Sequence, residues 1–208
     1  QFKDISLQIA GTWKDTPEKV REHAEGLCSG VQNAELVKVK SELTQFIVPE
    51  KIISQLKGEF DLVYGGQARV PKFPLPGYYK FLFKYAVYSK DESVANHALF
   101  TIKKILHSGM YDQVEGGIAR YSVDKYWKVP HFEKMLYDNA QFISLLSIAY
   151  NHSKDPSLLK ALDKNIQFTI EWFRSESGGY YSSIDSASEN EEGKYYVWDY
   201  DEIQRTTG

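Results

Sequence analysis

The stretch from Gly109 to Gln141 reads GMYDQVEGGIARYSVDKYWKVPHFEKMLYDNAQ and concentrates polar and aromatic residues. A purely structural segment spreads such residues more evenly, so their density predicts a functional site. The pair Gly116 and Gly117 marks a tight turn or a close backbone approach. Pro130 favours extended backbone just before His131, and we expect a helix to follow. The polar and aromatic members are Asp112, Arg120, Tyr121, Asp124, Trp127, His131, Glu133, Tyr137, Asp138 and Asn139.

Four helices are expected around this stretch, arranged as two pairs. The first pair covers residues 78–88 and 92–107, and the second pair covers a helix that starts after His131 and a helix over 156–174. Apolar residues recur at helical spacing in each of them. The connections within each pair are short, which predicts two antiparallel hairpins.

Pairs of glycines separate these hairpins. Gly65, Gly116 and Gly178 each begin a glycine pair, and they are 51 and 62 residues apart (116 − 65 and 178 − 116). A repeat of this length is typical of α-hairpins that cover their apolar faces only when they pack side by side. We therefore predict an all-α fold, a partial α/α toroid with about three of the six hairpins of a full ring. The three glycine loops should lie at the same end of it.

Upstream of this repeat, two scaffold helices are expected. Thr16 followed by Pro17 is a helix opening, and that helix should end near Gly30. The second helix should cover 49–57. We assign residues 1–58 to a linker and these lead-in helices, and residues 59–208 to the toroid.

Three segments carry a resemblance to a known family. They are residues 111–141, GGQARVPKFPLP at 65–76, and DSASENEEGKYYVW at 185–198. Together they resemble the signature of the YyaL-type, spermatogenesis-associated family, in which a thioredoxin-like domain precedes an α/α barrel. That barrel is similar to those of N-acylglucosamine 2-epimerases and six-hairpin glycosidases. The resemblance implies that residues 59–208 are the amino-terminal part of the barrel, with a thioredoxin-like partner domain outside this chain.

Two departures from the family pattern stand out. Residues 185–188 read Asp-Ser-Ala-Ser where the family reads Asp-Ala-Asp-Ser, so Ala187 replaces the second acid. Residues 66–68 read Gly-Gln-Ala in place of Gly-Phe-Gly.

Composition excludes several classes of function. The chain is 42% hydrophobic and 25% charged, with a net charge of −3, which is typical of a globular protein and does not favour nucleic acid binding. Cys28 is the single cysteine, so a CxxC redox site and a Cys-rich zinc site are excluded. The sequence holds no apolar run long enough to cross a membrane and no secretory signal at its start. We expect a cytoplasmic protein, a piece of a longer one, without a metal or another cofactor.

The catalytic candidates are a histidine and three carboxylates. Histidine is the residue type suited to proton transfer near neutral pH, so His131 can move a proton to or from a sugar, although a loop histidine is often structural. Glu133 should lie in the first turn of the following helix, where the helix dipole alone favours a carboxylate. Asp112 and Asp185 lie on glycine-rich loops that the toroid gathers at one end, where acidic residues often only form turns.

The ligand-binding candidates are aromatic or charged. Flat aromatic faces suit stacking against a sugar ring and equally suit a core. Arg120 has no acidic partner at helical spacing and is free to bind a carboxylate or phosphate. Asp138 is open to an alternative, a pair with Lys134 four residues earlier. The predicted binding residues are Arg120, Tyr121, Trp127, Tyr137, Asp138, Trp198 and Lys72.

Two functions from different classes fit these residues. In the first, the domain binds or acts on a sugar or related polyol through proton transfer by His131 and nearby carboxylates. The reaction would then be that of a sugar isomerase, an epimerase or a glycoside hydrolase, among which the fold alone does not choose. In the second, the domain is a non-catalytic scaffold that holds a protein segment for the thioredoxin-like domain. The loss of an acid at Ala187 favours the second.

Overall fold

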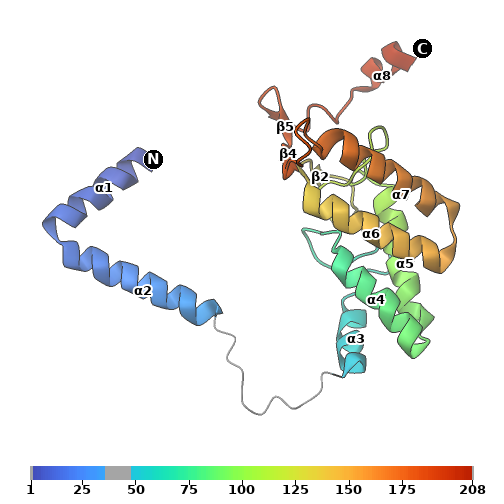
Figure 1. Ribbon diagram of the computed structural model, residues 1–208, viewed down its shortest axis with the longest axis horizontal. Helices are drawn as coiled ribbons and strands as arrows, with labels where there is room; N and C mark the ends of the chain where they lie inside the picture. The colour runs from blue at the N-terminus through green and yellow to red at the C-terminus, as the bar shows by residue number, and fades with distance from the viewer. Residues whose placement is uncertain (1, 36–47, 208) are drawn as a thin grey trace. The chain divides into compact units, whose positions relative to one another are not determined.

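The computed structural model describes residues 2–35 and 48–207, and the chain forms two compact units, residues 1–47 and 48–208 (Figure 1). The first unit consists of helices α1 (Phe2–Asp15) and α2 (Pro17–Glu35). Helix α2 begins at Pro17 as predicted, but it continues through Gly30. An added Cβ at Gly30 would meet nothing within 4 Å, so this exposed glycine is simply tolerated within the helix. The predicted linker falls largely on residues 36–47, outside the described residues.

The second unit contains the predicted helices in the predicted order. They are α3 (Pro49–Gly58), α4 (Pro76–Ser89), α5 (Glu92–Leu106), α6 (Leu136–Ser153) and α7 (Pro156–Phe168). A π-helical turn, η1 (Thr169–Phe173), extends α7, and α8 (Tyr200–Thr207) follows a long loop. Within the described part of the unit, two complete hairpins therefore have one helix before them and one after. None of the described helices combines the length and the apolar character that a membrane span requires.

The two hairpins are built in the same way. In each, a lysine in the left-handed conformation ends the first helix, and the next residue, an aspartate, caps the second: Lys90 and Asp91, then Lys154 and Asp155. Each cap also binds a lysine of the preceding odd-numbered helix. Lys57 Nζ lies 2.7 Å from Asp91 Oδ2, and Lys103 Nζ lies 2.6 Å from Asp155 Oδ2. These pairs hold the pKa of each aspartate at about 2. They link α3 to α5 and α5 to α7 in series.

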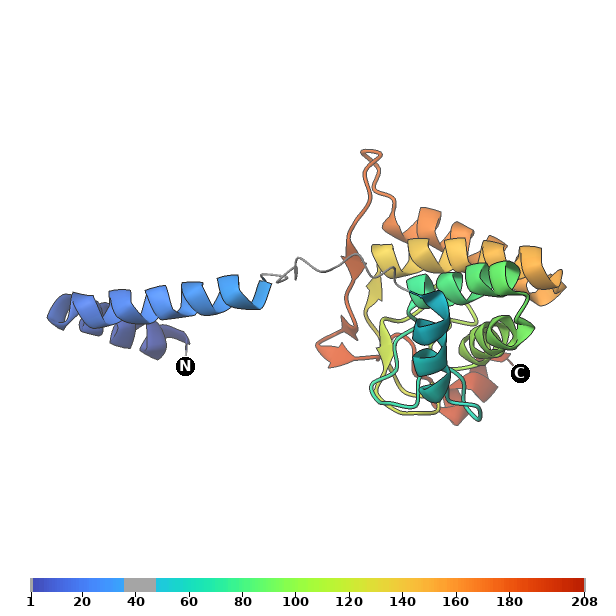
Figure 2. The same cartoon turned by 90° about the horizontal axis from the view of Figure 1, so that it is seen from below.

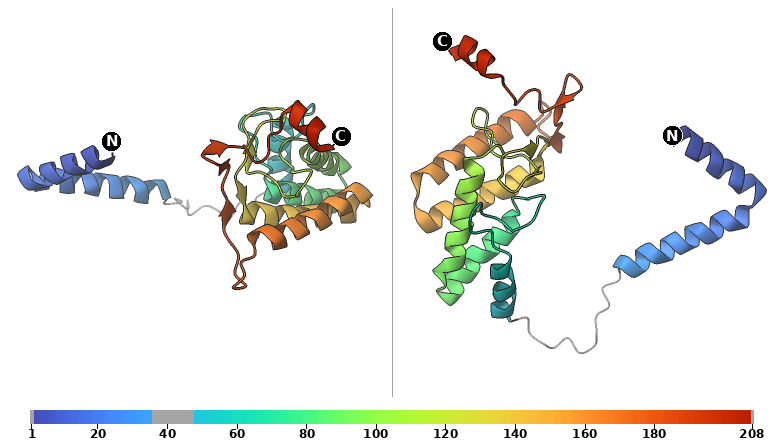
Figure 3. Two further views of the ribbon diagram at one scale, coloured as in Figure 1. Left: turned by 90° about the horizontal axis from the view of Figure 1, so that it is seen from above. Right: turned by 180° about the vertical axis from the view of Figure 1, so that it is seen from behind.

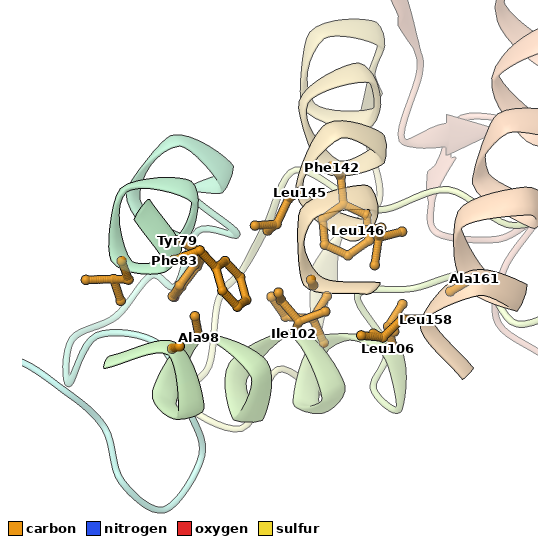
Figure 4. Close-up of a cluster of buried hydrophobic side chains, with 14 of the residues drawn as sticks. Tyr79, Phe83, Ala98, Ile102, Leu106, Phe142, Leu145, Leu146, Leu158 and Ala161 are labelled. Carbon is orange, nitrogen blue, oxygen red and sulfur yellow. The ribbon is translucent and has the colours of Figure 1, made fainter. Parts of the chain in front are cut away.

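A single apolar core lies between the hairpins. Helix α4 packs against both α5 and α6, and α6 packs against α7. Figure 4 shows side chains from all four helices directed toward one another. Tyr79, Ile102, Phe142 and Leu146 are fully buried in this core, and Ile53 of α3 joins it. This arrangement, in which each hairpin covers the next, is the one that the glycine repeat predicts.

The three glycine loops lie together at one end of the helices, as predicted. The loop before α4 pairs with the loop before α6 through Lys72 and Ser122, and the latter pairs with the loop after η1 through Lys134 and Ile184. Figure 2 shows the loops before α4 and α6 and the strand after α7 near the starts of α4 and α6, whereas the orange tip between α7 and that strand projects away from them. Figure 3 shows the segment after η1 crossing the same end. The short strands are β1 (Tyr121–Ser122), β2 (Pro130–His131), β3 (Lys134–Met135), β4 (Ser183–Ile184), β5 (Ala187–Ser188) and β6 (Glu191–Glu192).

The predicted start of the helix after His131 was wrong. Residues 130–135 are extended, and α6 begins only at Leu136. Strand β2 pairs with β1, β3 pairs with β4, and the Arg120 N–H donates to the Glu133 carbonyl oxygen at 3.0 Å. These bonds to two distant segments outweigh the local helical pattern. Glu133 therefore does not lie in a helical first turn; Asp138 does.

Truncation of the core should lower stability strongly. Leu146→Ala removes a fully buried side chain between the hairpins and should reduce the free energy of unfolding by about 2–5 kcal/mol. Ser144→Ala, an exposed position on the same helix, should change it by less than about 0.5 kcal/mol. Urea denaturation followed by circular dichroism measures both. Equal, small changes would contradict a shared core.

Candidate active site

The extended segment 130–135 separates two groups of side chains. Phe132 stacks on Tyr196, and the Lys134 ammonium lies 4.8 Å from the centroid of the same ring, so these two side chains face one way. His131 and Glu133 face the other way, because alternate residues of an extended chain point to opposite sides. The second group contains most of the predicted site residues.

Arg120, Glu133 and His131 form the centre of this second group. Arg120 NH1 donates to Glu133 Oε2 at 2.8 Å, and His131 Nε2 lies 3.9 Å from the same oxygen. The other histidine nitrogen, Nδ1, lies 2.7 Å from Oε1 of Glu192 on β6. Arg120 has no acidic partner at helical spacing, as predicted, but it has one in Glu133, which lies between β2 and β3. Each of these side chains remains partly exposed, so a ligand can reach them.

Two aromatic rings border the group. The ring of Tyr121 stacks on that of His131, with the centroids 5.2 Å apart. The ring centroid of Phe73 lies 5.0 Å from that of Tyr121. Phe73 is 41% exposed, so part of its ring is available to a ligand. The arrangement places flat apolar surface beside ionisable groups of both signs, which suits a sugar ring with its hydroxyl groups.

Asp138 and Tyr137 of α6 complete the group. Both act electrostatically on Arg120, and Tyr137 is 48% exposed. Burial raises the pKa of Asp138 to about 6; Arg120 opposes this rise and Glu133 adds to it. The Oδ2 atom of Asp138 is enclosed without a hydrogen-bond partner among the described residues. The alternative pairing with Lys134 does not occur, because Lys134 binds Asp112 instead.

Lys134 and Asp112 form a buried ion pair on the opposite side of the segment. Lys134 Nζ lies 2.7 Å from Asp112 Oδ2 and donates to the Gly116 carbonyl oxygen at 3.1 Å. Asp112 Oδ1 accepts the N–H groups of Val114 and Glu115, each at 2.9 Å. The pair therefore closes the glycine turn that leads to Arg120.

The same device occurs one repeat earlier. Lys72 Nζ lies 2.6 Å from Asp61 Oδ2 and 2.6 Å from the Gly65 carbonyl oxygen, and Asp61 Oδ1 accepts the N–H groups of Val63 and Tyr64. Both loops read Asp-x-Val-x-Gly-Gly. We call each unit of lysine, aspartate and glycine turn a lysine clamp. The third glycine loop keeps a turn between Ser175 and Gly179 but has no aspartate at the matching position.

Three predicted site residues thus have structural partners. Asp112 and Lys72 belong to the lysine clamps, with side chains 10% and 1% exposed. Trp127 is 1% exposed, and its Nε1 donates to the Tyr64 carbonyl oxygen at 2.9 Å. Gly66 lies against the Trp127 ring, where a Cβ would collide. The catalytic role of Asp112 and the binding roles of Lys72 and Trp127 stay predictions, and these residues lie outside the Arg120 group.

The two remaining candidates lie on the loop after η1. Asp185 is exposed and accepts the Ala187 N–H at 3.0 Å, which is a local turn contact. Trp198 is 57% exposed and borders a cavity of about 1060 Å³ on the Lys134 side of the segment, which Asp112, Phe132 and Tyr196 also line. Among the described residues, neither side chain forms a hydrogen bond, an ion pair or a ring contact with the Arg120 group.

Asn139 positions the site and was not assigned a role from the sequence. It is fully buried, and its Oδ1 accepts the Ile118 N–H at 2.8 Å while Nδ2 donates to the carbonyl oxygens of Ile118 and Met135. Ile118 lies two residues before Arg120. The amide of Asn139 therefore fixes the Arg120 segment to the start of α6. The signal in the sequence was a polar residue at helical spacing from the apolar residues Phe142 and Leu146, on the buried face of α6.

Known relatives match nearly the whole chain. Human spermatogenesis-associated protein 20 is 34% identical over 217 residues, and the mouse protein is 32% identical over the same length. Both matches cover 98% of this chain. Homologues of this chain include the spermatogenesis-associated protein 20 proteins. The chain spans 28% of the length of these curated relatives. No protein-family model matches it.

Solved structures confirm the fold. Cellobiose 2-epimerase from Spirochaeta thermophila aligns with a TM-score of 0.57 and 20% identity, over 64% of this chain and 36% of that one. A sugar epimerase from a ruminal bacterium aligns with a TM-score of 0.56 and 20% identity, over 67% of this chain and 39% of that one. This chain therefore contains part of an α/α barrel.

Loss of a lysine clamp should be costly. Lys134→Met leaves the Asp112 carboxylate buried without its partner, so the free energy of unfolding should fall by about 3–5 kcal/mol. The double variant Lys134→Met with Asp112→Asn should lose much less free energy of unfolding than the sum of the losses in the two single variants. Lys194→Met breaks the exposed pair with Glu189 and should cost at most about 1 kcal/mol. Denaturant unfolding measures the wild type, the three single variants and the double variant, and a Lys134→Met effect as small as that of Lys194→Met would contradict the clamp.

Proposed function

We propose that this domain binds a sugar or a related polyol at the Arg120 group and acts on it by proton transfer. One observation carries the proposal: a histidine, an arginine and three carboxylates lie together beside exposed aromatic rings, at the end of the barrel where the loops meet. Hydroxyl groups of a sugar can bind the charged groups, while its apolar face stacks on Phe73 or Tyr121.

The assignment of roles follows from the contacts. Arg120 donates hydrogen bonds to ligand oxygens while Glu133 holds its guanidinium in place. His131 is oriented by Glu192 and Glu133, so it is the group that moves a proton between the ligand and solvent. The structural neighbours that are named sugar epimerases are consistent with this chemistry, although at 20% identity they show only the fold.

A scaffold function is the second candidate, and one observation favours it. Ala187, at the position of the family's second acid, is exposed on β5, and Asp185 beside it makes only a local turn contact. In this function the loops hold a protein segment for the thioredoxin-like domain expected in the longer protein. A protein that binds that domain and no sugar would support it.

Isothermal titration with cellobiose, D-glucose and D-glucuronate tests the first proposal. His131→Ala and Glu133→Gln should each weaken binding by about 10- to 100-fold, because each removes a charge-assisted contact. His152→Ala is the matched control: His152 also contacts a glutamate, Glu92, but lies at the other end of α6. Binding that is weakened equally by His152→Ala, or no binding of any sugar, would contradict the proposal.

A further inference from the structure

Asp138 differs from every other carboxylate of the site in its surroundings. Glu133 has Arg120, and Glu192 has His131, but no hydrogen bond to the Asp138 side chain is present among the described residues. Its Oδ2 atom is enclosed by protein. A buried polar atom without a partner is unfavourable, by about 1–3 kcal/mol in general, so such atoms are rare unless they serve a function.

The groups around Asp138 disfavour its ionised form. Burial has the largest effect and raises the pKa, and the negative charge of Glu133 raises it further. Arg120 acts in the opposite direction but is shared with Glu133. Lys134, four residues earlier, binds Asp112 on the other side of the extended segment. The carboxyl group therefore holds its proton to a higher pH than an ordinary aspartate does.

We infer that Asp138 is the proton donor of the candidate site and that its protonated carboxyl group meets an oxygen atom of the bound sugar through Oδ1, the oxygen that is not enclosed. The inference rests on the proposed function. In the transfer step, the O–H bond of the carboxyl breaks and its electrons stay on Asp138, while a lone pair of the sugar oxygen forms the new O–H bond. The carboxylate that remains lies beside Arg120, whose positive charge stabilises it.

Two substitutions separate this role from packing. Asp138→Asn keeps the size of the side chain and can still donate a hydrogen bond, but it cannot titrate. Asp138→Ala can do neither. Asp163→Asn, on the exposed face of α7, is the matched control for removal of an acid.

The first readout is cellobiose affinity between pH 5 and pH 7.5, by isothermal titration on the full chain. Wild-type affinity should fall by about 30-fold over this range as one proton is lost. In Asp138→Asn this 30-fold fall in affinity should vanish. In Asp138→Ala binding should be weak at every pH. The control Asp163→Asn should keep the wild-type pH profile. An unchanged profile in Asp138→Asn would overturn the inference and leave the proposed function standing. A wild-type chain that binds no sugar would overturn both.

The second readout is the pH dependence of the melting temperature. Because the folded pKa is raised, the folded state binds this proton more tightly than the unfolded state, and stability is lost as pH rises from about 4 to about 6. Asp138→Asn should therefore melt a few degrees above the wild type at pH 7 and close to it at pH 4. A variant that melts below the wild type at both pH values would show that Asp138 is structural.

Discussion

The buried ion pair between Lys134 and Asp112 is the interaction on which the site depends. Its ammonium group joins an aspartate, a glycine carbonyl and the faces of Phe168 and Tyr196, which come from separate segments of the chain. A buried ammonium group is unfavourable unless an opposite charge and hydrogen-bond acceptors surround it. The requirement fixes the relative positions of the loop before α6, the end of α7 and the segment after η1. The Lys72 clamp does the same for the preceding loop.

The clamp and the site share one extended segment and use its opposite sides. Lys134 points toward the clamp, so its neighbours His131 and Glu133 must point toward Arg120. Asn139 adds a second tie between Arg120's segment and α6. The site residues are therefore held on rigid backbone while their side chains stay partly exposed. Preorganised, accessible acid–base groups are what proton-transfer chemistry needs.

Local patterns in the sequence were sufficient for the helices and for their order. The helix opening at Thr16 and Pro17 and the apolar stripes of the helices depend on residues a few positions apart, and the structure confirms them. The start of α6 was predicted wrongly because long-range pairing, such as Lys134 with Ile184, overrides a local helical pattern. Glu133, the partner of Arg120, is thirteen residues away in an extended segment, so helical spacing could not reveal the pair.

The repeat itself contained a signal for the clamps. Asp-x-Val-x-Gly-Gly occurs before both α4 and α6, yet the lysines follow the two aspartates at 11 and 22 residues, so their shared role appears only in three dimensions. Local spacing also placed Asp112 among the catalytic candidates, because an acid on a glycine-rich loop has the same pattern whether it binds a ligand or a buried lysine. Burial distinguishes the two, and burial follows from the packing of loops that are far apart in the chain.

Amide hydrogen exchange in Lys134→Met, compared with the wild type, tests the central claim most directly. The account predicts faster exchange at Ile118 and Arg120, whose N–H groups donate to Asn139 Oδ1 and the Glu133 carbonyl oxygen, with protection retained in α5 and in the central turns of α6. That pattern would show that the clamp holds the site's backbone in place. Unchanged protection at Ile118 and Arg120 would contradict it.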